Sequence, residues 1–279
     1  MKHIYTYGGH PAKRNLTFAC LQANKAAGQK MTQVSATSQE EAAACEALGI
    51  DMITISDLDI EAVRTGAPHT FVTGSQSMGQ YYEPQACLTA AIKCAEKGAD
   101  AIFTPRGMGI VELLANEGIC VQGHVGLVPR KSTQLGGLRT IGKTADEALA
   151  ILDHCRRYED AGAKAVEIEC VAVEALEAIN PLTSLITHSI GAGSGGDIIF
   201  SFMEDICGDV ENPPRHAKAW GDMLSIRQAL ADERLKALSG FQSDVKSGQF
   251  PDKAHTVSMP QSEHEKLLEA LDKRHPFHQ

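Results

Sequence analysis

The sequence predicts an α/β fold in the form of a closed (β/α)8 barrel, and three observations support this prediction. Short β-type runs alternate with longer helical patterns between residues 30 and 202. These runs are apolar throughout, which is typical of parallel strands that are covered on both faces. A length of 279 residues accommodates such a barrel, which needs about 250 residues. A doubly wound open sheet is the alternative, because strand counts from sequence are often wrong by one.

Eight segments have the composition of strands, and helical patterns separate most of them. The expected strands are 30–36, 50–56, 70–75, 99–104, 119–123, 163–170, 184–188 and 197–202. The expected helices are 38–49, 83–98, 109–118, 144–162 and 172–179. Ser38 with Glu41 and Thr144 with Glu147 form capping boxes that mark the starts of two helices, and Gly49 marks a helix end.

The barrel is expected to occupy residues 1–210, with residues 211–279 as a helical extension that packs on the barrel or on a neighbouring subunit. Past the last expected strand the βα pattern stops, and polar segments with Pro, Gly and Ser follow. One helix is expected over about 215–238, and a last amphipathic helix after a cap formed by Ser262 and Glu265. An extension of this kind suits a homo-oligomer.

Composition limits the class of protein. The chain has 26 basic against 35 acidic residues and a formal net charge of -9, and its basic residues are scattered, so nucleic acid is not an expected partner. Eight cysteines without any CxxC pair suit a reducing compartment. The first 30 residues lack the apolar core of a signal peptide, and no run reaches the roughly 18 apolar residues of a membrane span. We expect a cytoplasmic protein without a membrane partner.

Polar residues at the ends of the expected strands are the candidates for chemistry, because barrel enzymes hold their active sites at the C-terminal ends of the strands. The candidates are Ser35, Ser56, Asp57, Ser75, Thr104, His124, Glu167, Glu169, His188, Glu204 and Asp205. Glu167 and Glu169 stand two apart in an apolar run, so both point to the same side, into the barrel or its mouth. Buried carboxylates need a metal, a cation or a shared proton, and sharing makes one of them a general acid or base. In the alternative register both face the helices and form salt bridges.

His124, Asp57 and a glycine-rich run are weaker candidates. His124 lies at the mouth of the fifth strand between glycines that would let the backbone approach a ligand, or else a loop carbonyl satisfies its imidazole. Asp57 suits a metal ligand and a helix N-cap equally. The run 189–197, which includes Gly191 and Gly193, suits an anion site or a tight turn between strands.

Five stretches within residues 20–208 carry a resemblance to a known family. They are AVRTGAPHTFV, EPQACLTAAIKCAEKGADAI, GHVGLVPRKSTQLGG, EDAGAKAVEIECVAVEALEAI and SIGAGSGGD. In this order they resemble the ketopantoate hydroxymethyltransferase family, also called the 3-methyl-2-oxobutanoate hydroxymethyltransferase family. The resemblance implies a barrel of the phosphoenolpyruvate/pyruvate superfamily type and a homo-oligomer.

The resemblance also implies a reaction. The family transfers a hydroxymethyl group from 5,10-methylenetetrahydrofolate to 3-methyl-2-oxobutanoate, a step of pantothenate biosynthesis. In the family a divalent metal, for which Mg²⁺ is the candidate here, binds the 2-oxo acid and stabilises its enolate. Glu169 matches the glutamate that handles protons, and His124 matches the active-site histidine.

The metal ligands of the family pattern are depleted. Asp57 matches one carboxylate, but Ser75 and Pro105 stand where two others are expected. Asp57 alone would be a weak Mg²⁺ site unless Glu167, where the family has an apolar residue, contributes. Arg106 is a candidate replacement for a lost lysine that would bind the substrate carboxylate. The expected substrate contacts are Ser56, Ser75, Arg106, Gly191 and Gly193.

Three functions are compatible with these residues. The leading one is a hydroxymethyltransferase-like, C–C bond-forming enzyme that acts on a small 2-oxo acid with Glu169, His124 and Glu167 as catalytic residues. The second is a lyase or hydrolase of the same barrel family that acts on another small carboxylate with weak or no metal dependence. The third is a catalytically silent barrel that binds a metabolite.

Overall fold

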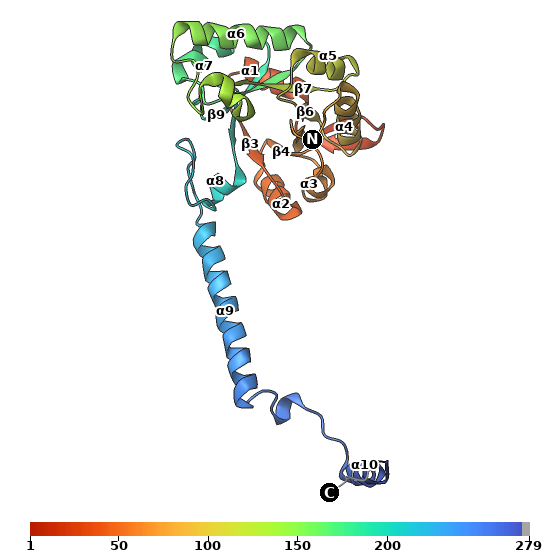
Figure 1. The fold of residues 1–279 in the computed structure, drawn as a ribbon. Coiled ribbons are helices and arrows are strands. Elements are labelled where there is room, and N and C mark those ends of the chain that lie inside the picture. The colour runs from red at the N-terminus through yellow and green to blue at the C-terminus, as the bar shows by residue number, and fades with distance from the viewer. Residues whose placement is uncertain (275–279) are drawn as a thin grey trace. The chain divides into compact units, whose positions relative to one another are not determined.

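The computed structural model describes residues 1–274, which divide into two compact units. The first unit covers residues 1–222 and holds the barrel, and the second begins at residue 223 and is helical. Figure 1 shows the barrel strands surrounded by their helices, with α9 and α10 in the second unit.

Eight strands close into a barrel in the order β10-β3-β4-β5-β6-β7-β8-β9. They are β3 (Met31–Ser35), β4 (Met52–Ser56), β5 (Phe71–Ser75), β6 (Ala101–Phe103), β7 (Val121–Gly126), β8 (Ala165–Glu169), β9 (Ile186–Ile190) and β10 (Ile198–Ser201). Each overlaps a predicted segment, although β7 and β9 end two or three residues later than predicted, so that His124 and His188 lie inside their strands. Every neighbouring pair is parallel. The ring closes where β10 pairs with β3, so the predicted barrel is confirmed and the open-sheet alternative is wrong.

Helices follow most strands, as the alternating pattern predicts. They are α2 (Gln39–Leu48), α3 (Ile60–Gly66), α4 (Pro84–Glu96), α5 (Met108–Asn116), α6 (Ala145–Asp160), α7 (Val173–Ile179) and α8 (Met203–Cys207), with 3-10 turns η1 (Pro129–Leu135) and η2 (Asn180–Leu182). Both predicted N-caps are confirmed, because Ser38 accepts a hydrogen bond from the Glu41 N–H and Thr144 accepts one from the Glu147 N–H. Gly49 ends α2 in the left-handed conformation, at a φ of 72°.

The N-terminal segment adds elements that the sequence pattern did not predict. An antiparallel hairpin of β1 (Lys2–Tyr5) and β2 (Pro11–Arg14) comes first, and α1 (Phe18–Ala26) follows it. Leu21 of α1 packs against apolar side chains at the N-terminal end of the barrel strands, including Met31, Met52 and Phe71. This layer fills the lower interior of the barrel, so the polar interior positions lie towards the C-terminal ends of the strands.

The second unit consists of α9 (Met223–Ser247), the short turn η3 (Lys253–His255) and α10 (Gln261–Arg274). Helix α9 begins and ends later than predicted. The predicted cap at Ser262 is wrong, since the Glu263 N–H already donates to the Pro260 carbonyl and places Ser262 inside the first turn. Among residues 1–274, no helix combines the length and the apolar character that crossing a membrane requires.

Candidate active site

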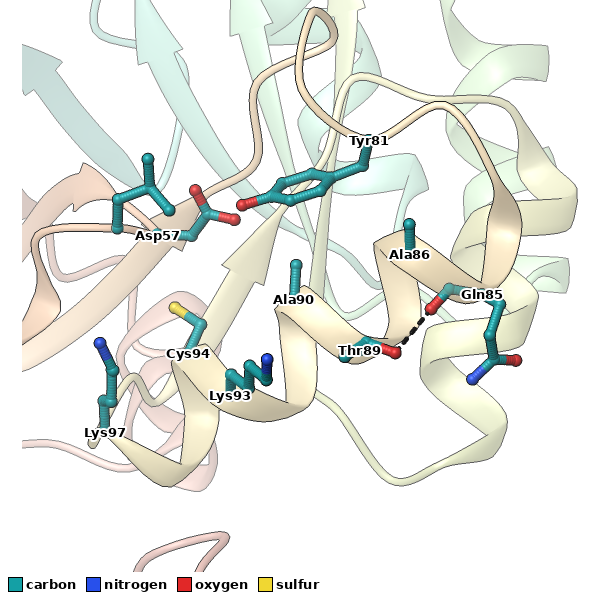
Figure 2. Close-up of a pocket in the computed structure, with 10 residues that line it drawn as sticks. Asp57, Tyr81, Gln85, Ala86, Thr89, Ala90, Lys93, Cys94 and Lys97 are labelled. Atoms are coloured by element: carbon teal, nitrogen blue, oxygen red, sulfur yellow. Dashed lines mark hydrogen bonds between the residues drawn. The ribbon is translucent and has the colours of Figure 1, made fainter.

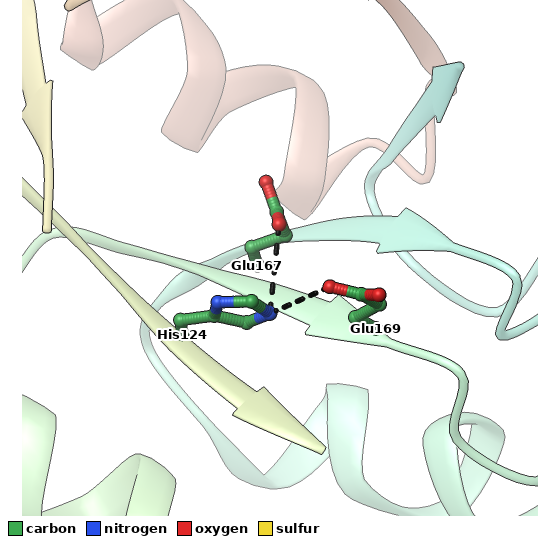
Figure 3. A group of neighbouring side chains, drawn as sticks. All are labelled: His124, Glu167 and Glu169. Atoms are coloured by element: carbon green, nitrogen blue, oxygen red, sulfur yellow. Dashed lines mark ion pairs between the residues drawn. The ribbon is translucent and has the colours of Figure 1, made fainter. Parts of the chain in front are cut away.

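Three side chains meet inside the barrel, near the C-terminal ends of β7 and β8 (Figure 3). Nε2 of His124 lies 3.0 Å from Oε2 of Glu169 and 3.6 Å from Oε1 of Glu167. The parallel register places His124 directly opposite Glu167 and Gly126 opposite Glu169. The sequence prediction that both glutamates point into the barrel is therefore confirmed.

Strand periodicity explains why these acids face inward. Along β8, Ala165 belongs to the apolar interior layer, and Glu167 and Glu169 continue the same face two and four residues later. Val166 and Ile168 take the other face and are fully buried in the layer between the strands and the helices. The alternative register, with the acids in surface salt bridges, is wrong.

Two carboxyl groups and one imidazole make up this cluster. Among residues 1–274, neither Glu167 nor Glu169 forms an ion pair with a lysine or an arginine. Burial raises the pKa of Glu167 to about 7, with His124 acting against this shift and Glu169 adding to it. Near neutral pH both the protonated and the charged form of Glu167 are therefore accessible, so it can either donate or accept a proton.

His124 is 4% exposed, and its imidazole faces the two acids at a tilt to the Phe103 ring. Its Nε2 atom lies within ion-pair distance of both carboxylates but has no hydrogen bond of normal geometry. Buried polar atoms without such a bond are rare and often mark a functional site. The imidazole and carboxylate donor atoms all lie within 4.8 Å of one another, which is close enough for one cation to bind all three.

A cavity of about 180 Å³ opens on His124. Its walls come from the loops that follow β5, β6 and β7, the usual place for ligands in a barrel of this kind. The lining residues are Gln76, Ser77, Met78, Phe103, Pro105, His124, Val128, Pro129 and Arg130. The volume suits a small organic acid, and the guanidinium of Arg130 supplies a positive charge.

The glycines that flank His124 serve packing rather than an approach to a ligand. A Cβ at Gly123 would collide with the Tyr158 ring of α6, and a Cβ at Gly126 would collide with the Glu169 carbonyl. The Tyr158 hydroxyl in turn donates to the His124 carbonyl at 3.2 Å. Tyr158, which the sequence pattern did not single out, thus fixes the backbone of the strand that carries His124.

His188 also points into the barrel, in register with Glu167. Its Nδ1 lies 2.6 Å from Oε1 of Gln33, and its Nε2 has no hydrogen-bond partner. Burial lowers the pKa of His188 to about 3, so the imidazole is neutral at physiological pH. Gln33 lies inside a β strand rather than at its end, so a search for polar residues at strand ends misses it.

The predicted substrate contacts at the ends of β4 and β5 and in the loop after β6 have protein partners in the structure. Ser75 lies 3.1 Å from the Thr54 hydroxyl, and Ser56 accepts a hydrogen bond from the Leu58 N–H. Arg106 donates to the carbonyls of Ser77 and Met78, which belong to the loop beside His124. Substrate binding by Ser56, Ser75 and Arg106 stays a prediction.

Gly191 and Gly193 lie in a direct connection between β9 and β10, with no helix between the strands. Both have positive φ angles, and the Gly193 carbonyl accepts a hydrogen bond from Ser189. This local structure is that of a turn, and an anion site at these glycines stays a prediction. Glu204 and Asp205 lie in α8 rather than at a strand end.

Asp57 is not part of the His124 cluster. It follows β4 and lines a different cavity together with residues of α4 (Figure 2). It does not cap α3 either, because the N-cap position belongs to Asp59 and no side chain makes a cap hydrogen bond there. Metal binding by Asp57 stays a prediction.

Known proteins resemble the chain along most of its length. A sequence model of the family described as ketopantoate hydroxymethyltransferase matches residues 58–253. A 3-methyl-2-oxobutanoate hydroxymethyltransferase of Pyrobaculum aerophilum is 32% identical over 73% of this chain and 77% of its own length. The chain belongs to the ketopantoate hydroxymethyltransferase family. A Methylibium petroleiphilum relative with the same function name is 26% identical over 95% of this chain and 96% of its own length.

Solved structures agree with the fold of this ketopantoate hydroxymethyltransferase family member. A phosphonopyruvate hydrolase in complex with oxalate and magnesium matches with a TM-score of 0.51, at 12% identity, over 93% of this chain and 99% of that chain. A 2,3-dimethylmalate lyase of the PEP mutase/isocitrate lyase superfamily matches with a TM-score of 0.51, at 14% identity, over 92% of this chain and all of that chain. These likenesses support the (β/α)8 barrel fold, and family membership makes the chain an enzyme.

Proposed function

We propose that this enzyme transfers a hydroxymethyl group to a small 2-oxo acid and thereby forms a C–C bond next to the keto group. The observation that carries this proposal is the approach of His124 and Glu169 to 3.0 Å beside a small cavity. Both residues match functional positions of the family. The curated relatives suggest 3-methyl-2-oxobutanoate as the acceptor, and the family resemblance suggests 5,10-methylenetetrahydrofolate as the donor and a role in pantothenate biosynthesis.

The proposed chemistry begins with a proton transfer. The Glu169 carboxylate accepts a proton from the carbon next to the keto group, and the electron pair of the broken C–H bond moves into an enolate. Both C–N bonds of the donor's methylene carbon break, one water adds its oxygen to that carbon, and tetrahydrofolate leaves with its two N–H groups restored. The enolate carbon forms the new C–C bond to this one-carbon unit, and the proton held by Glu169 goes to the resulting alkoxide, which becomes the hydroxymethyl group. His124 lies against Glu169, and Phe103 and the loop beside His124 form walls of the neighbouring cavity.

The metal that the family implies does not fit the family positions in this chain. Asp57 lies in another cavity, the Ser75 hydroxyl is engaged by Thr54, and Pro105 has no donor atom to offer. The donor set of His124, Glu167 and Glu169 does fit a divalent cation, and its imidazole favours Mn²⁺, Fe²⁺ or Zn²⁺ over Mg²⁺. A cation bound there would polarise the keto group of the acceptor.

The test is product formation by the full chain. Incubation with 3-methyl-2-oxobutanoate and 5,10-methylenetetrahydrofolate, with Mg²⁺, Mn²⁺ or Zn²⁺ in parallel, should give a new hydroxymethyl signal in the carbon NMR spectrum. Exchange of the C3 hydrogen in D₂O without the folate reports proton removal separately. Absence of both exchange and product with every metal would reject the proposed reaction.

A second candidate is a lyase or hydrolase that works without a metal on another small carboxylate. It is favoured by the loss of the carboxylates expected at Ser75 and Pro105, and by the proton that Glu167 can hold near neutral pH. Turnover that survives a chelator and is lost in Glu169→Gln supports this candidate. Complete inactivation by the chelator, restored by added metal, contradicts it.

The remaining proposals concern the cellular location, the small-molecule partner and the oligomeric state of the enzyme. We infer a cytoplasmic enzyme whose partner is a small 2-oxo acid or a related carboxylate, and which forms a homo-oligomer through its C-terminal extension. Supporting features are the cysteines, none of which is in a disulfide, and the absence of a membrane-spanning helix from residues 1–274. Light scattering of the full chain and of a chain ending at residue 222 would measure the contribution of the extension to assembly.

A further inference from the structure

A second cavity, of about 500 Å³, lies beside α4 on the outer side of the barrel strands (Figure 2). The loop after β4 contributes Asp57, and the loop between β5 and α4 contributes Tyr81. Small side chains of α4, Ala86 and Ala90, form an apolar wall. This volume is typical of sites for small molecules.

The carboxylate of Asp57 is buried here without an adequate partner. Asp57 is 5% exposed, and neither of its oxygens has a hydrogen bond of normal geometry. Burial raises its pKa, and the Tyr81 hydroxyl, which points at the carboxylate in Figure 2, lowers the pKa in part. Since a buried carboxylate without donors is costly, a ligand that supplies donors would bind favourably in place of the Tyr81 hydroxyl.

Both carboxylate oxygens of Asp57 lack a hydrogen bond of normal geometry, and this limits the kind of ligand that fits. Two parallel N–H groups on one planar ligand can reach both oxygens of a carboxylate at once, as a guanidinium does. A single hydroxyl donor would leave one oxygen unsatisfied. The small apolar side chains of Ala86 and Ala90 leave room for a planar ring that carries such a pair of donors.

Two lysines line the same cavity. Lys93 lies in the last turn of α4 and Lys97 is its C-cap, four residues later, so both lie on the same side of the helix end. Lys97 pairs with Glu61 at 3.2 Å, but both side chains are well exposed, so this pair is weak. Within residues 1–274, Lys93 has no ion-pair partner. An anionic group of a ligand would therefore find two available cations.

We propose that this cavity binds a planar heterocycle with adjacent N–H donors and an anionic tail, with the donors on Asp57 and the tail on Lys93 and Lys97. The identification of the ligand rests on the proposed function, because a reduced folate has this chemistry. Its pteridine ring carries an amino group beside an N–H, and its glutamyl tail carries carboxylates. The loop 76–83 lines both this cavity and the cavity at His124. A one-carbon donor bound here would therefore lie next to a loop that also lines the reaction site.

Calorimetry on the full chain tests the site with three probes: tetrahydrofolate, 6-methyltetrahydropterin as the head alone, and 4-aminobenzoylglutamate as the tail alone. Asp57→Asn should weaken binding of tetrahydrofolate and the pterin at least about tenfold and leave the tail probe unchanged, because only the head uses Asp57. The double variant Lys93→Gln with Lys97→Gln should weaken tetrahydrofolate and the tail probe but not the pterin. Lys143→Gln, an exposed lysine elsewhere on the barrel unit, is the matched control.

Equal tetrahydrofolate affinity in the wild type and Asp57→Asn, or no binding of tetrahydrofolate at millimolar concentration, would overturn the assignment. Unchanged circular dichroism and melting temperature show that the variants are folded. The binding result and the reaction are separable. If the Asp57 and lysine variants do not change turnover, the assignment of this cavity as the folate site is wrong and the proposed reaction still stands. If folate binding depends on Asp57 but no product forms, the proposed reaction is wrong and the folate site still stands.

Discussion

His124 and Glu169 face each other from neighbouring parallel strands, with Nε2 of the imidazole 3.0 Å from Oε2 of the carboxylate. Glu167 approaches the same nitrogen at 3.6 Å from within the barrel. Three titratable groups therefore share one buried volume in which a change of charge on any one affects the other two. The following predictions address each group and the packing that holds them.

Glu169→Gln should reduce product formation by about 10²- to 10⁴-fold, because the amide cannot accept the substrate proton. The melting temperature should change little, since Gln has nearly the same shape. Steady-state kinetics with both substrates give the measurement, and Glu174→Gln, an exposed acid on α7, is the control that should retain activity. Activity of Glu169→Gln within about threefold of the wild type contradicts the assigned role.

A divalent cation should bind at the His124 cluster rather than at Asp57. Mn²⁺ titration followed by electron paramagnetic resonance should show one site, weakened at least about tenfold in His124→Ala and in Glu167→Gln, because each change removes one of three donors. Asp57→Asn should leave the affinity unchanged. The opposite pattern, with loss in Asp57→Asn only, would place the ion at the family position.

The stability of the metal-free protein should depend on pH through Glu167. Its folded pKa of about 7 lies above the ordinary value of 4.5, so the folded state holds a proton that the unfolded state releases. Raising the pH from about 4.5 to 7 should therefore cost stability, up to about 3 kcal/mol. Glu167→Gln lacks this cost and should gain stability relative to the wild type as the pH rises.

Urea unfolding in the presence of a chelator, at pH 4.5 and pH 8, measures this difference. The gain of Glu167→Gln over the wild type should be small at the lower pH and largest at the higher pH. Glu174→Gln should show no such trend, because that side chain is exposed. A difference between wild type and Glu167→Gln that does not vary with pH would mean that Glu167 titrates normally.

Gly123→Ala should destabilise the barrel by about 1–3 kcal/mol, since a Cβ there meets the buried Tyr158 ring. Tyr158→Phe removes only the hydrogen bond to the His124 carbonyl and should cost about 1 kcal/mol. Gly107→Ala is the matched control, because its Cβ would meet nothing within 4 Å. Equal melting temperatures for Gly123→Ala and Gly107→Ala contradict the packing role of Gly123.

Local patterns in the sequence determine the barrel strands and the inward direction of Glu167 and Glu169. Apolar runs, helix caps such as Ser38 and the alternation of side chains along a strand depend on near neighbours, so they can be read without coordinates. The N-terminal hairpin and α1 escaped prediction because they are short and have weak periodicity. Their structure depends on contacts such as that between Leu21 and the apolar layer inside the barrel.

Only the tertiary structure decides which distant residues meet. The strand register brings His124 to Glu169 and Glu167, whereas Asp57, equally polar and equally placed after a strand, lies in a separate cavity. The tertiary structure also shows that Gly123 makes room for the ring of Tyr158, which belongs to a helix more than thirty residues later in the sequence. The physical reason is that the sequence shows only that a residue follows the end of a strand. Closure of the barrel and packing of the helices decide which cavity the side chain of that residue faces.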